Sequence, residues 1–126
     1  MRMVAVLAIM CFVCSCREET MKTTNQPYTV GVWIVNEGME DKFVARWESF
    51  AAWTAKNQRG AMTGYLLRDA DHPGQFLSFG GWGSEEAVKE WRARPEFKQF
   101  AADVKSLCKE FRPQSYMLVA TSDSKK

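Results

Sequence analysis

Histidine occurs only once in this sequence, and charge of neither sign predominates. The 17 basic and 15 acidic residues give a formal net charge of +2, and no basic cluster stands out. This balance gives no support to nucleic-acid binding, which needs a basic surface. The sequence also lacks a glycine-rich phosphate loop, a cluster of metal-ligating residues and a nucleophile motif. The sequence therefore gives no support to a P-loop nucleotide hydrolase, a metalloenzyme or an enzyme with a known nucleophile motif.

Cysteine is scarce outside the first sixteen residues, where Cys11, Cys14 and Cys16 lie. No disulfide framework is therefore indicated for the fold. Cys11 and Cys14 form a C-x-x-C pair, but the pair lies inside an apolar leader rather than at a strand-helix junction, which argues against a redox or metal pair. Cys108 is expected on a packed helix face as a small core residue, without a histidine partner that could make it a nucleophile.

No apolar run is long enough to span a bilayer. Arg2 precedes an apolar run over residues 4–13, which has the length of a signal-peptide core. Val13-Cys14-Ser15-Cys16 then resembles a bacterial lipoprotein box. Residues 1–16 are therefore predicted to be a signal-peptide leader, with Cys16 as the lipidated residue of a membrane-anchored lipoprotein. The alternative is translation from Met21, which would give a cytoplasmic protein without the anchor.

Aromatic residues and hydrophobic patterning are abundant between the two polar ends. Residues 17–27 are predicted to be a polar tether, residues 28–121 one folded domain, and residues 122–126 a polar tail. Five Trp and eight Phe are many for one domain of this size. Such an excess often lines a pocket or an interface.

Alternating and helical spacings predict four strands and two helices. The strands are expected over residues 28–35, 62–68, 75–82 and 111–120, and the helices over 39–58 and 84–108, the second broken at Pro95. Gly60 suits a left-handed helix cap, and residues 69–74 are rich in turn formers. The order predicts an α+β fold of the ferredoxin-like βαββαβ type, with an antiparallel sheet under the helices.

The first strand is apolar on both of its faces. One face is expected to carry Val30, Val32 and Ile34, and the other Gly31, Trp33 and Val35. Because the helices cover only one side of the sheet, the other side would be bare in a monomer. A bare apolar sheet face usually marks an interface, so we expect a homodimer with the two sheets face to face.

Four segments together resemble a known family. They are Val35-x-Glu-Gly-Met-Glu-Asp-Lys-Phe43, Gly64-x-Leu-x-Arg-Asp69, Phe76-Leu-x-x-x-x-Trp-x-Ser-Glu-Glu-Ala87 and Trp91-x-x-x-Pro-Glu-Phe97. This set resembles the antibiotic biosynthesis monooxygenase (ABM) domain, over about Tyr28 to Thr121. The resemblance implies a dimeric α/β barrel. Some members of the family oxygenate aromatic quinol-like or anthrone-like substrates without a metal or flavin, some degrade haem, and many have no known activity.

The haem-degrading branch of that family places a haem-ligating histidine on the helix after the tryptophan segment. The matching position here is Ala101, and the one histidine, His72, falls in the predicted hairpin loop. The resemblance therefore argues against haem degradation and implies that no cofactor is used.

The resemblance implies a monooxygenase that needs dioxygen and an aromatic or quinol-like small molecule. Such chemistry requires a dry apolar pocket, a proton acceptor or polarising hydrogen bond, and orientation of the substrate. The predicted catalytic residues are Asn36, Tyr65 and Trp82. The predicted substrate-binding residues are Trp33, Arg68, Phe79 and Trp91, with Arg68 stabilising the substrate anion.

Each of these residues also has a structural interpretation. Trp33 suits plain core or interface, Tyr65 a satisfied buried phenol, and His72 a turn. The alternative function is a non-catalytic dimeric module that binds a small hydrophobic ligand, and a structural domain without a pocket is a third. Whether the protein is an enzyme stays open at this point.

Overall fold

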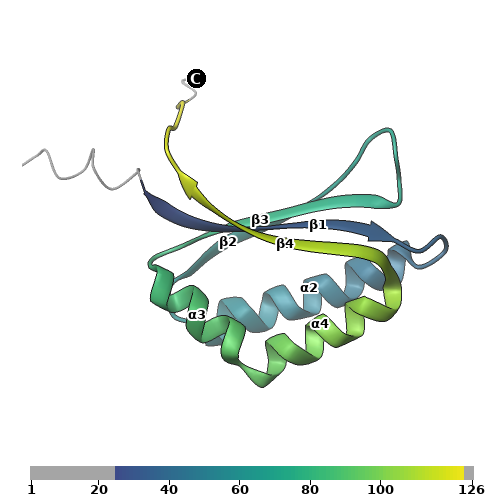
Figure 1. Cartoon of the computed structure of the whole chain (residues 1–126), viewed down its shortest axis with the longest axis horizontal. Coiled ribbons are helices and arrows are strands. Elements are labelled where there is room, and N and C mark those ends of the chain that lie inside the picture. Colours follow the sequence, from purple (N-terminus) through teal and green to yellow (C-terminus); the bar gives the residue numbers. More distant parts are fainter. Residues whose placement is uncertain (1–24, 124–126) are drawn as a thin grey trace, which may run out of the picture.

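The computed structural model describes residues 25–123, which form one antiparallel sheet with three helices on one of its faces (Figure 1). The elements are β1 (Gln26–Val35), α2 (Glu40–Asn57), β2 (Ala61–Arg68), β3 (Gln75–Trp82), α3 (Glu85–Ala93), α4 (Pro95–Leu107) and β4 (Cys108–Leu118). The leader over residues 1–16, with Cys16, and the alternative start at Met21 lie outside the described residues. No helix in the described part is both long and apolar enough to cross a membrane.

The strand order β2-β3-β1-β4 confirms the predicted ferredoxin-like α+β fold. β1 pairs antiparallel with both β3 and β4, and β2 with β3 forms the hairpin closed by the loop over residues 69–74. Pro95 separates α3 from α4, as the sequence predicts. Within the single chain the sheet is open, with β2 and β4 at its edges.

Several element boundaries differ from the sequence prediction by one to three residues, and two of the differences change the expected role of a segment. The expectation that Cys108 lies on a packed helix face is wrong, because α4 ends at Leu107 and Cys108 begins β4, paired with Val35. β1 also starts earlier than predicted, at Gln26, which pairs with Leu118. Both changes have one cause. The two strands pair along their full length, and the inter-strand bonds satisfy backbone groups that the sequence pattern assigned to a helix or a tether.

The core lies between the sheet and the helices. Phe43 of α2 and Val104 of α4 are fully buried there, and Trp33 of β1 stacks on Phe111 of β4 with ring centroids 4.0 Å apart. Gly60 has the positive φ of +90° that the sequence predicts, but it does not cap the helix: α2 ends at Asn57 with Gln58 as its C-cap, and Gly60 lies in the turn before β2.

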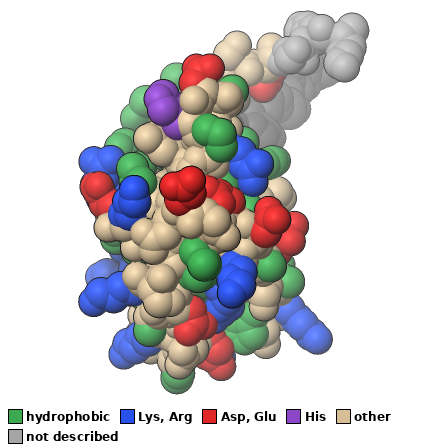
Figure 2. Space-filling model, turned by 90° about the vertical axis from the view of Figure 1, so that its right-hand side faces the viewer, with side chains coloured by type: hydrophobic (Ala, Val, Ile, Leu, Met, Phe, Trp, Pro, Cys, Tyr) green, Lys and Arg blue, Asp and Glu red, His purple; other side chains and the backbone are tan. Residues whose placement is uncertain are grey.

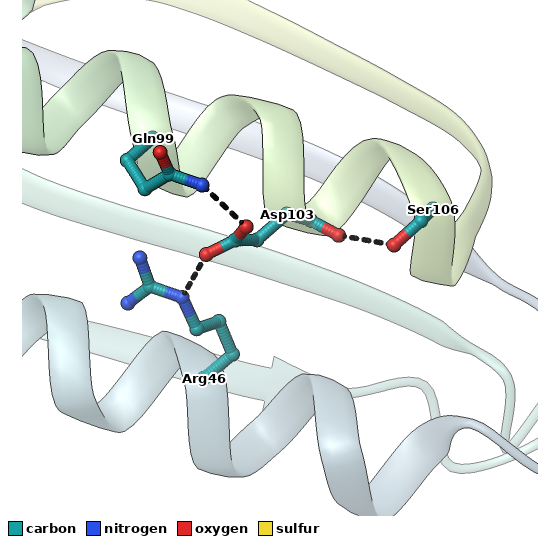
Figure 3. Close-up of polar contacts among 4 residues, drawn as sticks. All are labelled: Arg46, Gln99, Asp103 and Ser106. Atoms are coloured by element: carbon teal, nitrogen blue, oxygen red, sulfur yellow. Dashed lines mark hydrogen bonds and ion pairs between the residues drawn. The ribbon is translucent and has the colours of Figure 1, made fainter.

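An ion pair joins α2 to α4 beside this core (Figure 3). Arg46 Nε donates to Asp103 Oδ2 at 2.8 Å, and Gln99 Nε2 donates to Asp103 Oδ1 at 2.8 Å. The hydrogen bond from Arg46, followed by that from Gln99, holds the pKa of the Asp103 carboxyl below its usual value. The Arg46 guanidinium also lies 5.3 Å from the centre of the Phe100 ring. The polar contacts therefore fix how α2 and α4 sit against each other.

The face of the sheet opposite the helices carries exposed apolar side chains. Tyr65, Leu67, Leu77 and Tyr116 are each 39% exposed or more. By contrast, the end of the molecule near the β2-β3 hairpin shows acidic and basic side chains interspersed (Figure 2). The four exposed apolar side chains named above lie together on one face of the sheet.

Candidate functional site

A cavity of about 640 Å³ lies between the sheet and the helices. All four strands and all three helices contribute to its wall. The wall is mainly aromatic and aliphatic, with Phe50, Phe97 and Phe100 from the helices beside four tryptophans, one each from β1, α2, β3 and α3. Pockets of this size and composition hold small, largely apolar ligands.

Three of the four tryptophans in the wall each donate a hydrogen bond to a hydroxyl group. All three bonds are 3.0 Å long, and they run from Trp33 Nε1 to Ser78 Oγ, from Trp82 Nε1 to Thr29 Oγ1, and from Trp91 Nε1 to Thr54 Oγ1. The pairs join β1 to β3 twice and α3 to α2 once. They therefore fix the orientation of the indole rings relative to the cavity.

Gly31 makes room for the first of these pairs. A Cβ at this position would lie 2.9 Å from both Ser78 Oγ and Trp33 Nε1, closer than real Cβ contacts occur. Glycine at this position of β1 is therefore explained by the approach of the indole and the hydroxyl.

The same pairs define what the wall can offer to a ligand. A hydroxyl that accepts a bond from an indole keeps its own O–H as a donor. Ser78, Thr29 and Thr54 all border the cavity. These three hydroxyls can thus donate to acceptor oxygens on a ligand.

Arg92 is the one charged residue among the described residues that line the cavity. It lies in the last turn of α3 and is half-buried. Its Nη2 atom donates to Ser115 Oγ of β4 across a long distance of 3.4 Å.

Four of the residues predicted from the sequence border this cavity. Trp33, Trp82 and Trp91 are in its wall, and the Trp82 and Trp91 rings lie 4.8 Å apart. Phe79 borders it as part of β3, but the alternation of the strand turns its ring to the opposite face, where it lies 5.2 Å from the Tyr65 ring.

The other three predicted residues lie elsewhere in the fold. Asn36 follows β1 at the end where β3 begins, so it lies roughly 25–30 Å along the sheet from Trp82. Its backbone N–H donates to the Leu107 carbonyl. Tyr65 is 50% exposed on the uncovered sheet face, and the Arg68 guanidinium lies 5.1 Å from the Phe76 ring. The structure does not bring these three together with the tryptophans.

The residues present do not fit a haem group. Ala101, at the position of the family's haem-ligating histidine, borders the cavity but offers no ligand atom. His72 lies in the hairpin loop, where its Nδ1 is 3.4 Å from Asp69 Oδ2. Within residues 25–123, no three potential metal-ligating side chains cluster together. The described wall of the cavity therefore offers no histidine as an axial ligand to a haem iron.

The sequence prediction missed the hydroxyl partners and Arg92. A signal for Ser78 was available, because residues 76, 78, 80 and 82 of one strand share a face and Trp82 was already placed at the pocket. Arg92 directly follows Trp91, so it falls beside the predicted wall.

Comparison with known proteins gives the family. The model of the family described as antibiotic biosynthesis monooxygenase matches residues 28–103. The chain therefore belongs to the antibiotic biosynthesis monooxygenase family, as its sequence motifs predict. The comparison with curated proteins finds no match.

Several solved structures share the fold. SnoaB, a cofactor-independent oxygenase from Streptomyces nogalater, is 21% identical with a TM-score of 0.65, and the match covers 79% of this chain and 96% of SnoaB. A Shewanella oneidensis protein is 19% identical with a TM-score of 0.67, over 74% of this chain and 90% of that one. A Pseudomonas aeruginosa protein is 12% identical with a TM-score of 0.67, over 78% and 98%. At these identities the likeness concerns the fold alone.

Proposed function

We propose that this protein is a cofactor-independent monooxygenase that oxidises an aromatic, quinol-like or anthrone-like small molecule with dioxygen. The observation that carries the proposal is the aromatic cavity with its three indole–hydroxyl pairs. Membership of the family and the fold shared with SnoaB support the same reaction class. We assign Trp33, Trp82 and Trp91 to the substrate-binding wall.

The reaction needs little from the protein beyond this wall. For an anthrone-like substrate, a ring CH₂ group loses a proton to solvent and the carbanion transfers one electron to dioxygen. The superoxide then couples with the carbon radical, and the peroxide loses water. One oxygen atom enters the product as a carbonyl and the other leaves as water. The hydroxyl donors of Ser78, Thr29 and Thr54 can bind the substrate oxygen on which negative charge develops.

The sequence predicts catalytic roles for Asn36 and Tyr65 and an anion-stabilising role for Arg68, and these stay predictions. None of the three lines the cavity. Tyr65 lies on the uncovered face of the sheet, whereas Arg68 packs on Phe76 on the helix-covered face, so the two side chains do not share a site.

Oxygen uptake tests the proposal. The purified protein is mixed with a panel of anthrones, naphthols and hydroquinones in the presence of a chelator. We expect uptake above the uncatalysed rate for at least one substrate, unchanged by the chelator. Rates equal to those without protein across the panel would contradict the proposed activity.

One observation favours a second candidate function. Among the described residues that line the cavity, none is a carboxylate, a histidine or a tyrosine that could accept the substrate proton. A module that only binds a small hydrophobic ligand needs no such group. Ligand binding without any oxygen uptake would identify this alternative.

We also propose that the protein is a homodimer joined through the uncovered sheet faces. Leu77 is 39% exposed in the middle of this face, and the ion pair between Glu110 and Arg112 of β4 lies on the same face. Sedimentation velocity at micromolar concentration should give the mass of a dimer. Leu77→Lys should give a monomer, whereas Ala102→Lys on the exposed side of α4 should not. A monomeric wild-type protein would overturn this assembly.

The proposed location is the membrane surface, through lipid on Cys16. Membrane fractionation and the mass of the mature N-terminus test it. An acylated Cys16 supports the anchor, and a protein that begins at Met21 overturns it.

A further inference from the structure

We propose that Arg92 binds an anionic oxygen of the substrate, so that the site selects an aromatic compound with one acidic group. This inference rests on the proposed function, because it names the charge of the molecule that the same cavity takes. It replaces Arg68, which the sequence pointed to, with a residue that borders the cavity.

The first support is the contrast between Arg92 and the rest of the wall. The other residues that line the cavity are mainly aromatic and aliphatic, and the described lining residues include no carboxylate that would neutralise Arg92. An anion bound within the apolar wall is less screened from this half-buried guanidinium than it would be in open water. An aromatic anion fits both parts of the site at once.

The second support is how weakly Arg92 is held by the protein. Its one side-chain hydrogen bond in the described structure is the 3.4 Å contact with Ser115 Oγ. The neighbouring Arg94 has stronger partners. Arg94, two residues later, lies 5.2 Å from the Trp53 ring centre and 3.5 Å from a Glu96 carboxylate oxygen. Arg92 can therefore exchange its neutral partner for a ligand anion at little cost.

The third support is chemical. Oxygenation without a cofactor requires the substrate to be present as an anion, and the described wall has no base to remove its proton. A cation beside the acidic group lowers the pKa of the substrate, so that solvent can accept the proton. Arg92 would thus favour the reactive form of the substrate by binding it.

Two probes of the same shape test the proposal without any turnover. 2-Naphthoate is an anion and 2-naphthamide is its neutral counterpart, and binding of each is measured by calorimetry. Wild-type protein should bind 2-naphthoate about tenfold more tightly. Arg92→Gln should abolish that preference while leaving the affinity for 2-naphthamide within about twofold, and Arg92→Lys should restore part of it.

The matched control is Arg94→Gln, which removes the same charge outside the cavity and should keep the preference. Equal affinity of wild-type protein for the two probes, a preference that survives Arg92→Gln, or binding of neither probe would overturn the proposal. Thermal unfolding of each variant separates a loss of folding from a loss of recognition. Because the readout is binding, the protein can fail the oxygen-uptake test and still show that Arg92 selects anions, or the reverse.

Discussion

Removal of the Ser78 hydroxyl should destabilise the protein, because the buried indole N–H of Trp33 would lose its hydrogen-bond acceptor. Ser78 is 8% exposed and Trp33 is 3% exposed, and the Trp33 Nε1–H donates to the Ser78 oxygen at 3.0 Å. Without that oxygen, the indole N–H loses its partner in an apolar wall. A buried donor left unpaired costs about 1–3 kcal/mol. For a domain of about 100 residues, a loss of about 2 kcal/mol lowers Tm by roughly 8–16 °C.

A double-mutant cycle separates this hydrogen bond from other effects of the substitution. Ser78→Ala, Trp33→Phe and the double variant are unfolded with urea, and the free energies of unfolding are compared. When Phe replaces Trp33, no indole N–H is left without an acceptor. Adding Ser78→Ala should then lower the free energy of unfolding by less than about 0.5 kcal/mol. Ser106→Ala is the control, because Ser106 Oγ is exposed and bonds the Asp103 carbonyl. If Ser78→Ala costs no more than Ser106→Ala, the reasoning about the indole–hydroxyl pairs is refuted.

Three further predictions concern single residues. Gly31→Ala should lower the free energy of unfolding by about 1–3 kcal/mol, because its Cβ would lie 2.9 Å from Ser78 Oγ; a neutral result in urea unfolding would contradict the packing around Gly31. The pKa of Asp103 is lowered chiefly by the hydrogen bond from Arg46, so its contribution to stability is present above the unfolded-state pKa and is lost as pH falls through the folded-state pKa. The stability difference between wild-type protein and Asp103→Asn should therefore vanish in acid, and a difference independent of pH would argue against it. Burial raises the pKa of the Cys108 thiol to about 11, so at pH 8 iodoacetamide should label Cys108 about a hundredfold more slowly in native than in urea-unfolded protein, as followed by peptide mass spectrometry; equal rates would contradict its burial.

The sequence predicted the element order well because each element has a strong local signal. Pro95 breaks the second helical segment, Gly60 forms the turn between α2 and β2, and Ser84 caps α3 by accepting a bond from the Ala87 N–H. Such signals act over a few residues. Cys108 was misplaced because its conformation depends on pairing with Val35, more than seventy positions earlier in the chain.

The candidate site was harder to predict than the fold. Trp33, Trp82 and Trp91 were placed at the pocket because aromatic residues beside turns and on helix faces are easily recognised. Asn36 was grouped with Trp82 because both end a strand. Because β1 and β3 run antiparallel, however, their C-terminal ends lie at opposite ends of the sheet. The antiparallel sheet that the sequence predicts already implies that Asn36 and Trp82 lie far apart.

The indole–hydroxyl pairs could not be read from the sequence. Trp91 and Thr54 are 37 positions apart, and their bond depends on how α3 packs against α2. Single-residue patterns carry no information about such packing.

Blocking the cavity tests the central claim, that the space between sheet and helices is the site of oxygenation. Oxygen uptake is measured side by side for wild-type protein, Ala101→Phe, which fills the cavity, and Ala102→Phe, which adds the same ring to the exposed side of α4. We predict uptake by wild-type protein and Ala102→Phe, and at least a tenfold lower rate, on the order of 1.4 kcal/mol in the barrier, for folded Ala101→Phe. Equal rates for the two variants, or no uptake by wild-type protein, would contradict the claim.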